Sequence, residues 1–163
     1  MKIQLFLALA ALLWLCGCSP DSSAPGGDAP ALTQAPEFVD GWHLDWEAAK
    51  AETKARGMLL FALFTGSDWC PWCVKLEEEV LSTDAFRAYA RENLVLFKAD
   101  FLETPTAVSE AWKQQNEGVA SSLQIKGFPT IVLFAPAGGE VARMGYVPGG
   151  AKAFLAELAK CLR

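Results

Sequence analysis

The most informative stretch of the sequence reads Phe61-Ala62-Leu63-Phe64-Thr65-Gly66-Ser67-Asp68-Trp69-Cys70-Pro71-Trp72-Cys73. It begins within a continuous apolar run, 58–64, which is typical of a strand buried on both faces. A turn at 65–68 follows, and Pro71 suits the first turn of a helix. The stretch therefore predicts a buried strand, a turn and a helix that opens with a Cys-x-x-Cys motif.

The two cysteines of this motif can close a small ring or share a metal ion. At a helix start, the Cys70 sulfur should lie near unpaired backbone N–H groups and the positive end of the helix dipole, which favour the reactive thiolate. Cys73 lies one turn further along, so we expect it to be the more buried, resolving thiol. Redox, zinc and structural-disulfide interpretations compete for the motif alone, but the sequence lacks the second ligand pair of a four-ligand zinc site.

Strand and helix signals alternate outward from this stretch. Helices are expected at 46–56, 71–81, 84–92, 104–115 and 151–162, with a short helical turn at 119–123, and strands at 58–64, 94–99, 130–135 and 140–146. Asp45 and Thr104 are the expected caps of the first and fourth helices. This order predicts an α/β fold with a mostly parallel sheet, flanked by helices and closed by an antiparallel hairpin.

The motifs resemble those of the thioredoxin superfamily. Thr65–Cys73, followed by Lys75-Leu76-Glu77, resembles exported thioredoxin-like proteins whose motif reads Thr-Gly-Ser-x-Trp-Cys-x-x-Cys, and Gly127-Phe128-Pro129-Thr130 matches the family's Gly-hydrophobic-Pro-Thr signature. The resemblance covers about 42–163. It implies a thioredoxin fold with a mixed central sheet and an extra N-terminal helix. It also implies a thiol–disulfide oxidoreductase with Cys70 and Cys73 as catalytic residues and no cofactor or metal beyond their redox-active disulfide.

The resemblance further implies a substrate-binding surface beside the cysteines. In the family the proline at position 129 is cis and faces the Cys-x-x-Cys, so that the Phe128 backbone could pair with an extended substrate peptide. A trans-proline that only starts a strand is the alternative. Trp69, Trp72 and Phe128 could form an apolar rim for unfolded or extended partners, although core packing is the alternative for Trp69.

Leu63 is a departure from the family pattern. It stands where thioredoxins commonly carry a buried Asp that helps to deprotonate the resolving thiol. Asp68 or Glu77 could replace that proton relay, but solvated loop and helix charge is the favoured interpretation of both, and a solvated helix face that of the acidic run 77–79. We expect His43 to be exposed or capping and Cys161 to be a small buried thiol.

The N-terminus predicts an export signal. Met1-Lys2 precede an apolar run, 3–15, that is broken only by Gln4 and is shorter than the roughly 20 residues of a spanning helix. Leu15-Cys16-Gly17-Cys18 resembles the bacterial lipobox, with Cys18 as the lipidated residue; an ordinary cleaved signal or an uncleaved anchor is the alternative. We expect a signal peptide over 1–17, a flexible tether over 18–36 and the folded domain over 37–163.

Length, charge and cysteine content limit the possible functions. The 163 residues, 52% of them apolar, fit one domain, and a net charge of −5 without long basic runs argues against nucleic acid as a partner. We expect a monomer, lipid-anchored in the bacterial envelope and facing the periplasm, or otherwise secreted. It would exchange disulfides with exported proteins, with reduction or isomerisation favoured, and with an envelope thiol as electron donor or acceptor. The alternative is a Cu(I)-binding carrier on the same scaffold, with Cys161 or His43 helping.

Overall fold

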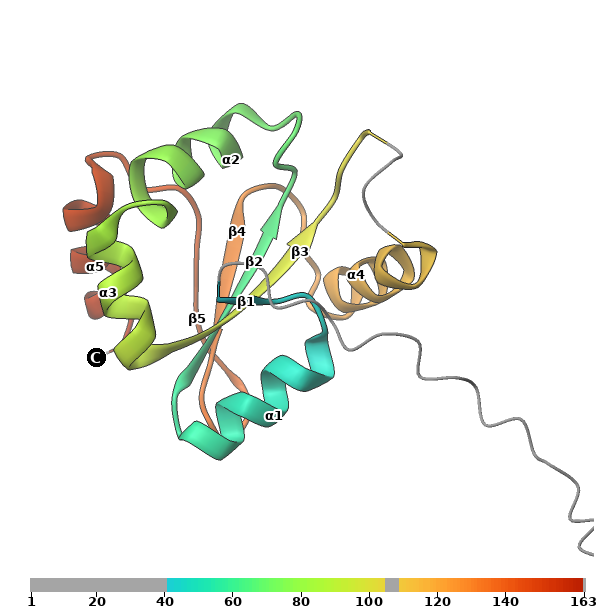
Figure 1. The fold of residues 1–163 in the computed structure, drawn as a ribbon, viewed down its shortest axis with the longest axis horizontal. Helices are drawn as coiled ribbons and strands as arrows, with labels where there is room; N and C mark the ends of the chain where they lie inside the picture. The colour runs from blue at the N-terminus through green and yellow to red at the C-terminus, as the bar shows by residue number, and fades with distance from the viewer. Residues whose placement is uncertain (1–40, 105–108, 163) are drawn as a thin grey trace, which may run out of the picture. The chain divides into compact units, whose positions relative to one another are not determined.

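A mixed five-stranded sheet forms the centre of the protein (Figure 1). The computed structural model describes residues 41–104 and 109–162. The strands are β1 (Trp42–His43), β2 (Leu59–Thr65), β3 (Leu94–Asp100), β4 (Thr130–Phe134) and β5 (Glu140–Met144), in the order β1-β3-β2-β4-β5. The first three strands in this order run parallel to one another. Strand β4 pairs antiparallel with both of its neighbours, β2 and β5. The predicted thioredoxin fold with its closing hairpin is thereby confirmed.

Helices cover both faces of the sheet (Figure 1). They are α1 (Trp46–Arg56), α2 (Pro71–Leu76), the π-helical turn η1 (Glu77–Leu81), α3 (Asp84–Asn93), α4 (Glu110–Ser122) and α5 (Gly150–Cys161). The core cluster on one face takes residues from α2, η1, α3 and α5, and the cluster on the other face takes residues from α1 and α4. The sheet is therefore the middle of three layers.

Strand β2 lies at the centre of this sandwich and is buried from Leu60 to Thr65. Because side chains alternate along a strand, Phe61 and Leu63 pack toward α3 and α5, while Ala62 and Phe64 pack toward α1. The Phe61 ring meets the Phe86 ring edge to face at 5.6 Å between centroids. Burial on both faces explains the unbroken apolar run. It also holds β2 rigidly in place, and the turn that leads to Cys70 begins at the end of this strand.

The caps of α1 agree with the sequence. The Asp45 carboxylate accepts the Ala48 N–H at 2.6 Å, and Gly57 ends the helix in the left-handed conformation with φ 64°. These contacts satisfy backbone groups that a helix leaves unpaired at its two ends. The extra N-terminal helix is thus confirmed with its predicted bounds.

Helix α4 begins later than predicted. The Ser109 hydroxyl, not Thr104, caps it by accepting the Trp112 N–H at 3.4 Å, and the helix runs unbroken from Glu110 to Ser122. The predicted start at Thr104 and the separate turn at 119–123 were wrong. Glu110 adds an acidic group in the first turn, which the helix dipole favours. Residues 105–108 lie outside the described residues.

His43 and Cys161 also differ from their predictions. His43 is buried in the edge strand β1 and its Nε2 lies 2.7 Å from Glu52 Oε2 in α1. The two-residue β1 is too short to show an alternating pattern, so the exposed or capping assignment was wrong. Cys161 is half-buried near the end of α5 rather than fully buried.

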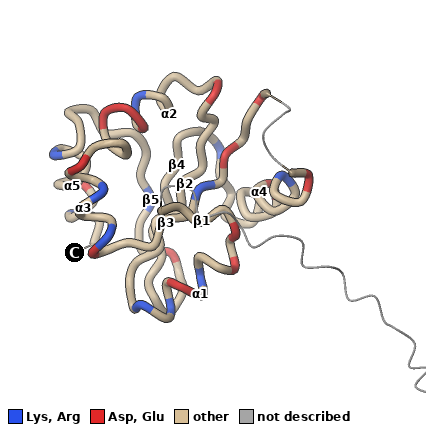
Figure 2. Tube along the Cα trace, in the orientation of Figure 1, with Lys and Arg blue, Asp and Glu red and all other residues tan. Residues whose placement is uncertain are grey.

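Charged residues of both signs lie mainly on the helices and loops (Figure 2). In the acidic run only Glu78 is exposed; Glu77 lies 3.6 Å from Lys98, and the Tyr146 hydroxyl donates a hydrogen bond to Glu79. Glu77 and Glu79 thus contact other elements, but the Glu77 side chain is still 47% exposed, so the expected solvated charge holds for Glu77 and Glu78 and is wrong only for Glu79. Within 41–104 and 109–162, no helix combines the length and apolar character needed to cross a membrane. The predicted signal peptide, Cys18 and the tether lie outside the described residues.

Candidate active site

Cys70 and Cys73 lie at the start of α2, as predicted. Cys70 has an extended backbone and occupies the N-cap position, its N–H donates to the Gly66 carbonyl at 2.9 Å, and Pro71 takes the first helical position. Both cysteines are free thiols and both are buried, with exposed fractions of 4% and 3%. Cys73 is therefore hardly more buried than Cys70, and the two thiols differ in their surroundings instead.

The Cys70 sulfur faces the segment before β4. It donates to the Phe128 carbonyl at 3.6 Å and accepts the Cys73 N–H at 3.3 Å. The Phe128–Pro129 bond is cis, as the resemblance implied. Residues far apart in the sequence thus meet at one sulfur, which lies between the helix start and the Phe128 backbone.

The Cys73 sulfur faces the end of β2. Burial, followed by the hydrogen bond with Cys70, raises the pKa of the Cys73 thiol to about 11. The Gly66 N–H, 3.5 Å from the sulfur, and the Thr65 hydroxyl act in the opposite direction and lower the pKa. Cys73 is consequently a protonated thiol at neutral pH, and its thiolate, when formed, is met by two donors.

The two carboxylates considered as proton relays serve other contacts. Asp68 accepts the Glu103 N–H at 3.2 Å and the Thr104 N–H at 2.9 Å. The Thr104 N–H in particular holds the pKa of Asp68 below its ordinary value. Glu77 lies beside Lys98, and Leu63 is buried in the apolar cluster below α2. None of these three side chains is among the groups that shift the pKa of Cys73.

Trp69 is both packed against the domain and partly exposed at the site, so it fits both the core-packing and the apolar-rim interpretations. Its side chain is 41% exposed, yet its ring lies edge-to-face with Phe128 at 5.8 Å and its Nε1 donates to the Phe101 carbonyl at 2.7 Å. The indole also packs directly over Gly66. Trp69 is therefore a fixed wall of the site with one open face.

Trp72 forms the other aromatic wall with a residue that sequence reasoning missed. Its side chain is 56% exposed, and its ring lies 5.5 Å from that of Tyr146, which follows β5. Lys75 Nζ lies over the Trp72 ring, 5.5 Å from its centroid. No sequence signal linked Tyr146 to the motif, because their contact depends on how the β5–α5 connection packs against η1.

Thr65 is the second missed residue. It was predicted to lie in the turn, but it is the last residue of β2 and is 4% exposed. The two-residue period of a strand places it on the same face as Phe61 and Leu63, toward α2. That period was a signal in the sequence that could have identified it.

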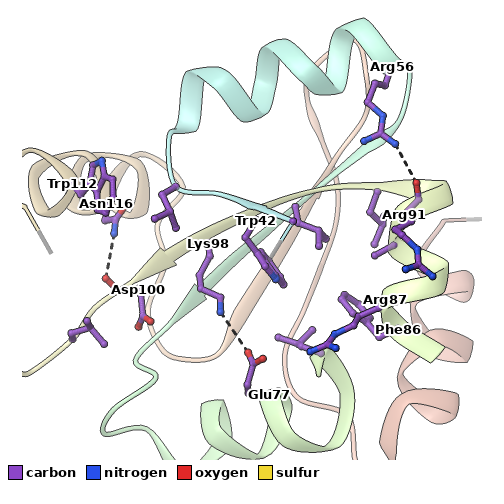
Figure 3. Close-up of a pocket in the computed structure, with 17 residues that line it drawn as sticks. Trp42, Arg56, Glu77, Phe86, Arg87, Arg91, Lys98, Asp100, Trp112 and Asn116 are labelled. Carbon is purple, nitrogen blue, oxygen red and sulfur yellow. Dashed lines mark hydrogen bonds and ion pairs between the residues drawn. The ribbon is translucent and has the colours of Figure 1, made fainter. Parts of the chain in front are cut away.

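A cavity of about 460 Å³ lies beside β1 and contains neither cysteine (Figure 3). Trp42 and Phe86 contribute apolar walls, and Arg87 and Lys98 contribute charged ones.

Across 41–104 and 109–162, no three His, Cys, Asp or Glu side chains are grouped as metal ligands would be. His43, which the copper alternative would use, lies at the β1 edge against Glu52.

The mixed sheet and the dithiol at a helix start, facing a cis-proline, define the thioredoxin class of proteins. The chain belongs to the thioredoxin-like domain family, whose model matches residues 46–161.

Two similar proteins and one solved structure agree with this membership. The chain is 31% identical over 124 residues to the disulfide bond reductase DsbH of Chlamydia pneumoniae, a match covering 74% of each protein. It is 31% identical over 104 residues to the thioredoxin-related protein DsbJ of the same organism, covering 64% of this chain and 30% of DsbJ. A solved DsbH oxidoreductase structure superposes with a TM-score of 0.69 at 28% identity, covering 80% of this chain and 92% of that one. The protein is accordingly a thiol–disulfide oxidoreductase.

Proposed function

We propose that the protein reduces or isomerises disulfides in exported proteins, with Cys70 as the nucleophile and Cys73 as the resolving thiol. The observation that carries this assignment is the difference between the two sulfurs: Cys70 faces the Phe128 carbonyl at the helix start, whereas Cys73 is a buried thiol with a pKa raised to about 11. The reductive direction is supported by the similarity to a protein named a disulfide bond reductase.

In the proposed reaction, the Cys70 thiolate attacks one sulfur of a substrate disulfide. A mixed disulfide forms, the substrate S–S bond breaks, and the second substrate sulfur leaves as a thiolate and takes up a proton. Cys73 then attacks the Cys70 sulfur, which closes the Cys70–Cys73 disulfide and releases the first substrate sulfur. The substrate gains two electrons and two protons, and an envelope thiol donor returns the protein to the dithiol form.

We place the substrate across the aromatic walls of the site. An extended segment lying between Trp69 and Trp72 would pass the Cys70 sulfur and could pair with the Phe128 backbone beside Pro129, as an added strand does. Both indoles are substantially exposed, so each can contact a substrate without leaving its own packing. This surface suits unfolded or extended polypeptides better than a small ligand held in a deep cavity.

We further propose that Cys18 carries a lipid anchor in the bacterial envelope, on the periplasmic side, and that 18–36 tether the domain to it. The lipobox-like sequence and the short apolar run before it support this location. The test is fractionation of cells that make the full chain. Wild-type protein should be found with membranes and a Cys18→Ser variant should not; equal release of both would contradict the anchor.

Insulin reduction and a redox titration test the activity. Wild-type protein should reduce insulin, and both the Cys70→Ala and Cys73→Ala variants should lose turnover. A reduction potential near −270 mV against glutathione would support a reductase, whereas one near −120 mV, the level of a strong oxidase, together with no insulin reduction would contradict it. Metal analysis of the reduced protein covers the copper alternative: stoichiometric copper without reductase activity would favour a carrier.

A further inference from the structure

The Cys73 sulfur lies in a small donor site at the end of β2. The Gly66 N–H points at the sulfur from 3.5 Å. The buried Thr65 side chain ends β2 on the same face as Phe61 and Leu63, and hydrogen bonding by its hydroxyl lowers the pKa of Cys73. Thr65 and Gly66 are both buried, so water competes little for these two donors. Hydrogen bonds from an N–H and an O–H strengthen when the sulfur becomes an anion, because charged acceptors bind donors more tightly than neutral ones.

The local structure holds both donors in place. Thr65 is paired with Asp100 in the β2–β3 ladder, and its carbonyl accepts the Phe101 N–H at 2.8 Å. Its branched side chain has restricted rotation in a strand and leaves on the face toward α2. The Trp69 indole packs over Gly66 and limits how that peptide can move. The donors are thus preorganised rather than recruited during the reaction.

We propose that Thr65 is a further catalytic residue, whose hydroxyl, with the Gly66 N–H, stabilises the Cys73 thiolate as that sulfur attacks the mixed disulfide on Cys70. In this step the Cys73–Cys70 S–S bond forms and the bond from Cys70 to the substrate sulfur breaks. The electron pair of the broken bond leaves with the substrate sulfur, which takes up the proton that Cys73 has lost. Thr65 donates a hydrogen bond throughout and exchanges no proton.

This inference rests on the proposed roles of Cys70 and Cys73, and it concerns the second step only. Cys70 is bonded to the substrate in the mixed disulfide, so its thiol no longer raises the pKa of Cys73 there. Burial still raises the pKa of Cys73 in that state, and the Thr65 hydroxyl and the Gly66 N–H are the donors that lower it. Removing the hydroxyl should therefore slow resolution without slowing the first attack.

Thr65→Val removes the hydroxyl at nearly constant volume, and Thr65→Ser keeps it. The matched control is Thr53→Val, because the buried Thr53 hydroxyl has no hydrogen-bond partner among the described residues. The first readout needs no substrate: thiolate absorbance titrates Cys73 in a variant in which the other four cysteines, 16, 18, 70 and 161, are replaced by Ala. Thr65→Val should raise that pKa by about one pH unit or more, whereas Thr65→Ser and Thr53→Val should change it little.

The second readout is single-turnover reduction of insulin by full-length protein, quenched with acid. Thr65→Val should accumulate mixed disulfide and resolve it roughly tenfold more slowly, Thr65→Ser should resolve within about twofold of wild type, and Cys70 alkylation should be unchanged. An unchanged Cys73 pKa, or equal slowing of both steps, would overturn the role of Thr65. Failure of the wild type to reduce insulin would instead contradict the proposed function, since the pKa titration is independent of it.

Discussion

The indole of Trp69 occupies the space in which a side chain at Gly66 would begin. A Cβ on Gly66 would lie 2.7 Å from Trp69 Cζ2 and closer still to Cε2, which is well inside normal carbon contact. The rest of the indole is held by its bond to the Phe101 carbonyl. Glycine is therefore required here by a close approach of two groups rather than by backbone conformation.

Gly66→Ala should destabilise the protein by about 1–3 kcal/mol, the usual cost of overpacking, and should lower insulin reduction because the Trp69 wall is displaced. Urea unfolding and the insulin assay measure the two effects. Gly118→Ala is the control: nothing lies within 4 Å of its Cβ position in α4, and alanine should stabilise the helix by about 0.5–1 kcal/mol. Equal stability of the two variants would contradict the contact.

Cys73→Ala should trap mixed disulfides on Cys70, because the thiol that resolves them is missing. Non-reducing gels of cells that make this variant should show adducts that disappear on reduction. Cys70→Ala should show far fewer, since Cys73 is buried and protonated at neutral pH. Adducts on the Cys70→Ala variant alone would reverse the proposed roles.

Trp72→Ala should reduce activity toward proteins but not toward small disulfides. A lost aromatic contact is worth about 0.5–1.5 kcal/mol, which corresponds to a roughly two- to tenfold lower kcat/KM with insulin. The rate with a small aromatic disulfide reagent should stay within about twofold. Val141→Ala, which trims another exposed apolar side chain on β5, should change neither rate. A matching loss with both substrates would argue against a docking role for Trp72.

The dithiol form should lose stability at alkaline pH through Cys73. Its folded-state pKa of about 11 lies above the roughly 8.5 expected in the unfolded chain, so the folded state binds more protons between these values. The contribution is fully present below about pH 8.5 and is lost as the pH rises toward 11. Urea unfolding in reductant should therefore show wild type losing stability relative to Cys73→Ala across this window. Parallel curves would contradict the raised pKa.

The sequence predicted the elements whose signals are local. The apolar run around Phe61 and the Cys-x-x-Cys spacing were sufficient to place β2, the turn and the start of α2, and the Asp45 cap and Gly57 correctly bounded α1. These features depend on neighbours within a few residues. Their physical causes can be read directly from the residue types: the pattern of apolar residues, the capping side chain and the conformational freedom of glycine.

Features that depend on distant neighbours were missed or misplaced. His43 is buried because β1 pairs with β3, and Tyr146 reaches Trp72 because the β5–α5 connection packs on η1. The start of α4 was misplaced since Thr104 and Ser109 are both good caps, and the structure holds Thr104 against the Asp68 loop while Ser109 caps the helix. In each case a tertiary contact decided between two locally acceptable structures.

The three residues before Cys70 each direct a polar group at the last residue of β3 or at the segment that follows it. Ser67 donates its N–H and hydroxyl to the Asp100 carboxylate at 3.0 and 2.6 Å, Asp68 accepts from Glu103 and Thr104, and Trp69 donates to Phe101. The active-site loop is consequently held in shape by a second segment, residues 100–104. A graft of the Cys-x-x-Cys loop onto another scaffold would carry over its redox behaviour only if residues 100–104 travelled with it.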